Sequence, residues 1–191
     1  MEISEKKIEN LEKLLNIKIK KIDFDIESID KKYIAEAKKL LPNNNYIGFS
    51  ITQGNEYRKK SWKLENFISL AKNVEKNNKI PVFFIKKESE EIVKQIKSKV
   101  PNSLFPEHNS DIADPALVTA LSSRLEKAVS IDNGVMHMMA LANIPMIVLF
   151  GPTNSSKFAP KNKFTKILDS KKTHNSKDIN SIEVDEVLSL I

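Results

Sequence analysis

The sequence contains no cysteine among its 191 residues. A disulfide framework, a thiolate metal site and a cysteine nucleophile are therefore all excluded. Only four glycines are present, and neither a G-x-G-x-x-G pattern nor a Walker lysine loop occurs. Because a glycine-rich phosphate loop is excluded, binding of a phosphate would depend on helix N-termini and on lysine side chains.

Metal-binding and membrane-spanning signals are also missing. The three histidines, His108, His137 and His174, are scattered and lack the spacing of metal ligands. No apolar run approaches the length of a transmembrane helix, and the N-terminus is charged and unlike a signal peptide. We therefore expect a cytoplasmic protein without a metal site.

Positive charge is present but unevenly distributed along the chain, whose formal net charge is +6. Residues 46–100 hold twelve Lys and Arg against six Asp and Glu, whereas the sections on either side are nearly balanced. A local basic zone favours an anionic ligand, although a solvated lysine-rich surface is the alternative. No DNA- or RNA-binding module is recognisable, so we expect no nucleic-acid partner.

Residues 127–152 contain the strongest structural pattern, in which two continuous apolar runs, 128–131 and 146–150, flank a turn and a short helix. Continuous runs are typical of parallel strands that are buried on both faces. Between them, Asp132-Asn133-Gly134 favours a turn and a helix cap, and Asn143 can close the helix. The stretch therefore predicts a βαβ unit.

Strand and helix patterns alternate over the rest of the chain, which predicts an α/β fold with a doubly wound, Rossmann-like parallel sheet. Residues 1–45 carry two amphipathic helix patterns and an imperfect strand pattern, and we expect them to form a helical connecting segment before a main domain of residues 46–191. The other predicted strands are 46–50, 80–85, 103–105 and 164–168, the predicted edge strand is 17–24, and the predicted helices are 2–16, 28–41, 64–74, 88–100, 115–124 and 182–191.

A ligand site is predicted at the turn of residues 132–134. Ligands bind at the carboxyl ends of the strands in open α/β sheets, and a helix N-terminus favours an anion. Gly134 would let the backbone approach a ligand closely, and His137, one helical turn further, can point to the same mouth. The alternative is an Asp or Asn cap beside a hydrogen-bonded structural histidine.

A second candidate constellation follows the predicted strand 46–50. Thr52 is followed by the basic run Arg58-Lys59-Lys60, in a loop at the same edge of the sheet as Asp132. Such a loop can bring a cation over a bound pyrophosphate. The alternative is an exposed basic loop without a ligand.

Residues 132–153, D-N-G-V-M-H-M-M-A-L-A-N-I-P-M-I-V-L-F-G-P-T, resemble the D-[ST]-G-x-x-H-x-A-x-A-x-x-x-P-x-x-x-x-F-G-P-T signature of glycosyltransferase family 9. This family comprises the ADP-heptose:lipopolysaccharide heptosyltransferases and their relatives. Asn133 stands where the family usually has Ser or Thr, and Met139 replaces a usual Ala. The Lys60-Ser61-Trp62 run also resembles the family's donor-phosphate loop, with Lys63 in place of a proline.

The resemblance covers about residues 46–170 and implies the C-terminal, donor-binding half of a GT-B enzyme. The family's N-terminal domain binds the acceptor and supplies the catalytic aspartate, so we expect a fragment, a truncated gene product or half of a split enzyme. No catalytic residue is expected in this chain beyond Lys60, which would stabilise transition-state charge. The implied nucleotide-sugar contacts are Thr52, Arg58, Lys60, Asp132, Asn133, Gly134 and His137, with Glu90 as the ribose-binding acid and Glu88 as its alternative.

The resemblance therefore implies inverting transfer of a sugar from a nucleotide-sugar, such as ADP-heptose, to a lipopolysaccharide or another glycan. The donor is a substrate, and no separate cofactor is expected. A separate N-terminal acceptor-binding domain or subunit is the implied partner, and peripheral association with the inner membrane is compatible with this reaction. The alternative is a non-catalytic module that binds a nucleotide or nucleotide-sugar.

Overall fold

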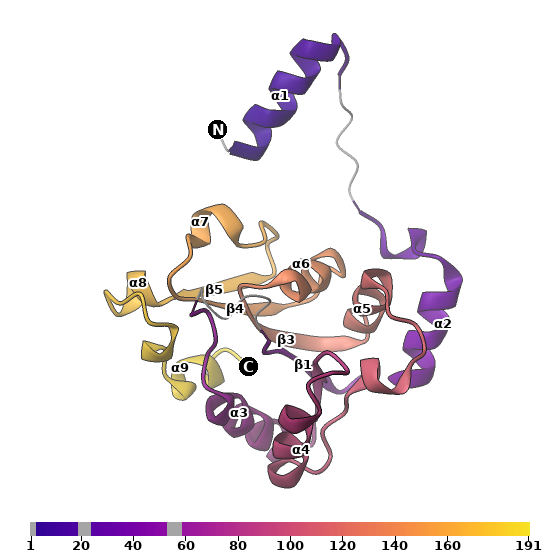
Figure 1. Cartoon of the computed structure of the whole chain (residues 1–191), viewed down its shortest axis with the longest axis vertical. Coiled ribbons are helices and arrows are strands. Elements are labelled where there is room, and N and C mark those ends of the chain that lie inside the picture. Colours follow the sequence, from indigo (N-terminus) through magenta and orange to yellow (C-terminus); the bar gives the residue numbers. More distant parts are fainter. Residues whose placement is uncertain (1–2, 19–23, 53–58) are drawn as a thin grey trace.

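The computed structural model describes residues 3–18, 24–52 and 59–191, and within these residues the fold is built on a parallel sheet of five strands (Figure 1). The strand order is β2-β1-β3-β4-β5, and every neighbouring pair is parallel. This confirms the predicted α/β class. The strands are β1 (Tyr46–Ser50), β2 (Ile80–Phe84), β3 (Leu125–Ile131), β4 (Met146–Phe150) and β5 (Thr165–Asp169).

Helices cover both faces of the sheet, as the alternation of strand and helix patterns predicts. One apolar core lies between the sheet and α3, α4 and α9, and a second lies between the sheet and α2, α5 and α6. The α-helices are α1 (Ile3–Leu15), α2 (Lys31–Leu40), α3 (Leu64–Lys76), α4 (Glu90–Lys99), α5 (Pro115–Ser122), α6 (Gly134–Leu141), α7 (Ser155–Phe158), α8 (Ser170–Thr173) and α9 (Val184–Leu188). Short 3₁₀ helices span Ile26–Ser28, Pro106–Asn109 and Ile179–Ser181.

The central strands consist of consecutive apolar residues because each of their two faces packs against an apolar core. In β4, Ile147 and Leu149 belong to the core under α3, whereas Met146, Val148 and Phe150 belong to the core under α5 and α6. Side chains alternate between the faces of a strand, so each of the two layers receives every second residue. This packing fixes the register of the sheet and thus the position of its carboxyl edge.

Two predicted helix boundaries have the expected local chemistry. The Asp114 carboxylate accepts a hydrogen bond from the Ala116 backbone nitrogen at 2.7 Å, and Pro115 begins α5. That bond, together with one from the Tyr33 hydroxyl, lowers the pKa of Asp114. At the end of α6, Asn143 adopts a φ of 56°, the left-handed conformation typical of a helix C-terminus.

The N-terminal section divides into two parts that differ in packing. Helix α1 lies apart from the sheet in Figure 1, and its Leu14 is exposed. By contrast, α2 packs beside α5 and buries Ala37 fully in the second core. The folded unit therefore begins before Tyr46, because α2 supplies part of the core.

Two predicted strands differ from the structure. Residues 19–23 of the predicted edge strand lie outside the described residues, and the flanking residues 17–18 and 24–25 form no strand. Residues 103–105 contribute a single parallel bridge, between Val82 and Leu104, rather than a strand. The chain then enters the 3₁₀ helix Pro106–Asn109, which the sequence analysis does not predict.

Among the described helices, none combines the length and the apolar character that crossing a membrane requires.

Candidate functional site

The site lies where the order of the strands reverses. From β1 the chain passes to β2 on one side of it and later to β3 on the other side. The loops that leave β1 and β3 therefore separate at their carboxyl ends, and such a point is the usual ligand crevice of an open α/β sheet. Thr52 follows β1 there, and the turn Asp132-Asn133-Gly134 follows β3.

Asn133 ties these two strand ends together. Its side-chain oxygen accepts a hydrogen bond from the Met136 backbone nitrogen at 2.9 Å and so caps α6. Its side-chain nitrogen donates to the Ser50 hydroxyl at 2.7 Å and to the Thr52 carbonyl at 2.9 Å. The helix cap is thus Asn133 and not Asp132, and the side-chain amide holds the backbone around the turn.

Lys60 and Asp132 meet beside this turn, as expected for two groups at one mouth of the sheet. The Lys60 ammonium lies 2.6 Å from the Asp132 carboxylate and 3.2 Å from the Asp132 carbonyl oxygen. Only 12% of the Lys60 side chain and 8% of the Asp132 side chain are exposed. The pair is therefore largely desolvated, and an anion bound at this mouth would share the ammonium with Asp132.

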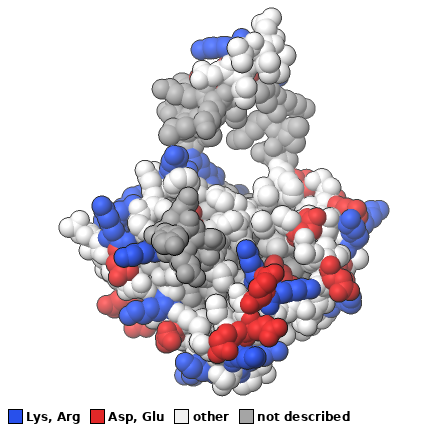
Figure 2. Space-filling model, viewed as in Figure 1, with Lys and Arg blue, Asp and Glu red and all other residues white. Residues whose placement is uncertain are grey.

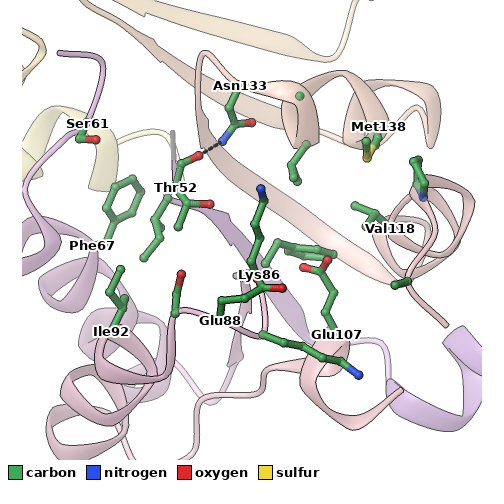
Figure 3. Close-up of a pocket in the computed structure, with 18 of the residues that line it drawn as sticks. Thr52, Ser61, Phe67, Lys86, Glu88, Ile92, Glu107, Val118, Asn133 and Met138 are labelled. Atoms are coloured by element: carbon green, nitrogen blue, oxygen red, sulfur yellow. Dashed lines mark hydrogen bonds between the residues drawn. The ribbon is translucent and has the colours of Figure 1, made fainter. Parts of the chain in front are cut away.

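A cavity of about 1120 Å³ opens next to the N-terminus of α6 (Figure 3). Its volume exceeds that of most single-ligand pockets, so it can hold a molecule as large as a nucleotide-sugar. Both polar and apolar side chains line the cavity. Its lining residues include Thr52, Lys86, Glu88, Glu107, Ile112, Val118, Asn133, Gly134 and Met138.

Gly134 presents open backbone to this cavity. A Cβ atom added at Gly134 would have no described atom within 4 Å, apart from its chain neighbours and its own helix. The residue begins α6, where backbone N–H groups point out of the helix and favour an anion. The space in front of Gly134 can therefore admit a ligand atom close to the backbone.

The other predicted site residues are placed differently. Arg58 lies outside the described residues. Glu88 lines the cavity, whereas Glu90 is exposed in the first turn of α4 and is not part of the wall. His137 is exposed, lies outside the wall, and makes no hydrogen bond within the described part of the chain.

The family model of glycosyltransferase family 9 (heptosyltransferase) matches residues 4–185, nearly the whole chain. The chain belongs to glycosyltransferase family 9. The match extends the resemblance beyond residues 46–170 at both ends and includes α2, which packs into the core. No curated protein sequence gives a significant match.

Solved structures of family 9 proteins share the fold. A glycosyltransferase family 9 structure from Veillonella parvula superposes with a TM-score of 0.72 at 19% identity, covering 85% of this chain and 51% of the other. For the Escherichia coli ADP-heptose LPS heptosyltransferase II the TM-score is 0.67 at 17% identity, with 85% and 50% covered. For E. coli heptosyltransferase WaaC with ADP the TM-score is 0.64 at 17% identity, covering 80% of this chain and 47% of the other.

This chain therefore spans about half the length of the family 9 structures that it matches. Its five-stranded parallel sheet, with helices on both faces, matches these GT-B glycosyltransferases over that half. At these identities the superpositions establish the fold alone, so assignments of individual residues depend on the geometry of this chain.

The family signature also contains a residue whose role here is structural. A Cβ atom added at Gly151 would lie 2.8 Å from the Ile179 Cβ and 2.9 Å from the Ile179 backbone nitrogen. Ile179 is buried and opens the 3₁₀ helix Ile179–Ser181. Gly151 thus allows the C-terminal segment to pack directly on the end of β4.

We expect Gly151→Ala to lower the free energy of unfolding by about 1–3 kcal/mol, because the backbone of Ile179 must move to admit the methyl group. Urea denaturation measures this change. Gly134→Ala is the matched control, since the same methyl group meets no described atom there, and it should stay within about 0.5 kcal/mol of the parent. Equal stability of the two variants would contradict the packing role of Gly151.

The charged residues of the cavity wall include several that are absent from the sequence-based site, among them Glu107 and Lys86. Lys86 follows β2, and Figure 3 shows its side chain between the Thr52 side and the Glu107 side of the cavity. Glu107 lies on the 3₁₀ helix Pro106–Asn109, and its burial raises its pKa to about 7. Neither residue belongs to a sequence motif. Lys86 follows strand β2, and Glu107 follows the Leu104 bridge beside that strand, so their position after these segments is the signal that could have indicated them.

Charge on the molecular surface is mixed on the face drawn in Figure 2, where Lys and Arg alternate with Asp and Glu. Among the described residues that are visible on that face, the Lys and Arg side chains therefore form no continuous basic patch. Among the described residues, no group of three His, Cys, Asp or Glu side chains is placed to hold a metal ion.

Proposed function

We propose that this chain binds the nucleotide-sugar donor of a heptosyltransferase-like family 9 glycosyltransferase. The observation that carries the proposal is the meeting of three groups at the reversal point of the sheet: the open N-terminus of α6, the Lys60–Asp132 pair and Thr52. Thr52 and the N-terminus of α6 line a cavity large enough for a nucleotide-sugar, and the Lys60–Asp132 pair adjoins the same turn without forming part of the cavity wall. WaaC structures with ADP and with ADP-2-deoxy-2-fluoro heptose share this fold, which supports a donor of that chemical class.

In the proposed reaction, an acceptor hydroxyl of a lipopolysaccharide or another glycan attacks the anomeric carbon of the donor with inversion. The bond between that carbon and the pyrophosphate breaks, and the acceptor proton passes to a base that we do not place in this chain. Negative charge grows on the leaving pyrophosphate, so stabilisation of that charge is the task of the donor-binding half.

The residues at the mouth have distinct proposed roles in this task. The free N–H groups at the start of α6, beside Gly134, donate to phosphate oxygens. The Lys60 ammonium, held by Asp132, lies near the same oxygens and lowers the energy of the leaving group. Asn133 acts on the ligand indirectly, because its side chain fixes the turn from which the N–H groups project.

Glu88, rather than Glu90, is the better placed of the two acids to reach the ribose, because it lines the cavity. His137 is exposed at the rim of α6 and would contact the donor only if the donor extended past the wall of the cavity. Both assignments are secondary to the phosphate site.

We expect Gly134→Ala to weaken the binding of ADP by about tenfold or more, because the methyl group occupies the space in which a phosphate would approach the backbone. Isothermal titration with ADP, GDP and UDP measures this, and the parent's affinity should fall as salt rises. Lys72→Ala, on the exposed side of α3, is the control and should bind as the parent does.

An unchanged affinity in Gly134→Ala, with a parent that binds nucleoside diphosphates, would place the phosphates away from the N-terminus of α6. A parent that binds none of the three nucleotides would remove the proposed function itself.

A further inference from the structure

A second cavity, of about 850 Å³, opens at the amino edge of the sheet, which is the edge opposite to the candidate site. This amino-edge cavity is lined by Tyr46 and Ile80, which are the first residues of β1 and β2 and are partners in the register of the sheet. Thr52, in contrast, comes after the end of β1. A strand of five residues spans about 15 Å, so one small ligand cannot occupy both cavities.

One buried hydroxyl on the wall of the amino-edge cavity lacks a partner. Ser103 lines the cavity and is 4% exposed, and its hydroxyl has no hydrogen-bond partner within the described part of the chain. A buried hydroxyl without a partner is costly, and a ligand that supplies the partner recovers that free energy.

The Tyr46 hydroxyl is a second unused donor at this cavity. Tyr46 is 1% exposed, and its hydroxyl oxygen accepts a hydrogen bond from the Asn43 backbone nitrogen at 3.1 Å. The O–H group itself donates to none of the described residues. Asn43 and Asn102 also line the cavity, and among the described residues their side-chain amides make no hydrogen bond. Hydroxyl and amide groups each contain both donors and acceptors, so the wall offers both.

The segments that carry these groups are held in place. Arg124 donates to the Pro42 carbonyl oxygen at 3.2 Å and to the Asn43 carbonyl oxygen at 3.0 Å. On the other side of the cavity, the Leu104 backbone nitrogen donates to the Pro81 carbonyl oxygen at 2.9 Å, which ties the segment after α4 to β2. A ligand would therefore meet a largely pre-formed wall, and little ordering would oppose its binding.

The charges around the amino-edge cavity balance. Lys79, which lines the cavity, is paired with Glu126, and the charge of Lys97 is offset by that of Glu75 on the same wall. Helices α3 and α4 both end beside this cavity, and the carbonyl groups at a helix C-terminus disfavour an anion. The wall therefore favours a neutral ligand, unlike the N-terminus of α6 at the other edge of the sheet.

We propose that the amino-edge cavity is a carbohydrate-binding site, which holds a neutral sugar residue of a glycan away from the donor site. The hydroxyl groups of a sugar both donate and accept hydrogen bonds, as the groups on this wall require. The C–H faces of the ring are apolar, and apolar side chains lie between the polar groups of the wall, namely Leu40, Pro42, Ile80, Pro101 and Leu104. This inference goes beyond donor binding, because it depends on different residues.

The test is a titration of the whole chain followed by ¹H–¹⁵N NMR, with D-glucose, D-mannose and D-galactose in turn and with inorganic phosphate as the anionic probe. We expect at least one hexose to give saturable shifts at the amides of Asn43, Asn102 and Ser103. The Kd should be about 1–10 mM, because a single sugar ring makes few contacts. Phosphate should give no saturable shift at these amides, since the charges around the cavity balance.

A serine variant and a matched serine control sharpen the test. Ser103→Ala should weaken hexose binding by about tenfold, because the ligand loses the hydroxyl as a partner. The same change should not lower the urea concentration at the midpoint of unfolding, since no described group loses a hydrogen bond. Ser98→Ala is the control: Ser98 is exposed on α4, donates to the Gln95 carbonyl oxygen at 2.8 Å, and should bind hexoses as the parent does.

The absence of a saturable shift with all three hexoses would overturn the inference. An unchanged hexose affinity in Ser103→Ala would overturn it as well, and so would saturable shifts at these amides with phosphate alone. ADP added in the same experiment reports on the donor site through the amides of Asn133 and Gly134. Binding of ADP without binding of a hexose would leave the proposed function standing, whereas binding of a hexose without ADP would support this inference and contradict the proposed function.

Discussion

Replacing Lys60 by methionine is expected to lower the free energy of unfolding by about 3–5 kcal/mol, because the substitution leaves the Asp132 carboxylate buried without its cation. The two groups are 2.6 Å apart, and both side chains are largely removed from water. Urea denaturation at neutral pH measures the loss. Far-UV circular dichroism of the variant checks that it still folds.

A double-mutant cycle separates the pair from the effect of either residue alone. Asp132→Asn should also destabilise the protein, and adding it to Lys60→Met should cost much less than the sum of the two single changes. The control is the partly exposed ion pair of Lys79 and Glu126, which Lys79→Met should break at a cost of no more than about 1 kcal/mol. A loss for Lys60→Met as small as that of the control would show that the pair does not support the turn.

The stability of the protein should also depend on the ionisation of Glu107. The pKa of this carboxyl is about 7 in the folded protein and near its ordinary value of 4.5 in the unfolded chain. Between these values the folded state retains a proton that the unfolded state has released, so the free energy of unfolding falls as pH rises through this range. At about 1.4 kcal/mol per pKa unit, the full decline is about 3 kcal/mol.

Glu107→Gln should remove this decline, because glutamine does not ionise. We expect the variant to be about 3 kcal/mol more stable than the parent at about pH 8 and equally stable at about pH 4. Urea denaturation over this pH range is the measurement, with Glu91→Gln as the control for loss of a solvated acid. A gain that does not change with pH would rule out ionisation as its cause.

Local sequence patterns predict most of the fold. The predicted strand 46–50 coincides with β1, and the Asp114-Pro115 pair begins α5 as expected. These features depend on a few neighbouring residues, such as an apolar run or a side chain that accepts from a backbone nitrogen two positions ahead. The turn of residues 132–134 was found for the same reason, since it follows a continuous apolar run.

Contacts between distant residues were only partly predictable. That Lys60 and Asp132 share one edge of the sheet follows from the strand pattern, but their ion pair joins residues 72 positions apart. Likewise, the choice of Asn133 as the cap depends on its second contact, with Ser50 across 83 positions. Glu107 carries no local signal, because its burial is produced by packing of the segments around it.

The packing of α2 has a consequence for shortening this protein. Ala37 and Leu41 are fully buried, and Arg124 donates from its side chain to the Leu41 carbonyl oxygen at 3.1 Å. A chain trimmed to begin at Tyr46 would expose the apolar side of α5 and leave Arg124 without that acceptor. Trimming should therefore stop before Asp30, whose side chain caps α2. A boundary placed at the first strand would remove one helix of the α2–α5 interface. The apolar surface exposed on α5 would then favour aggregation.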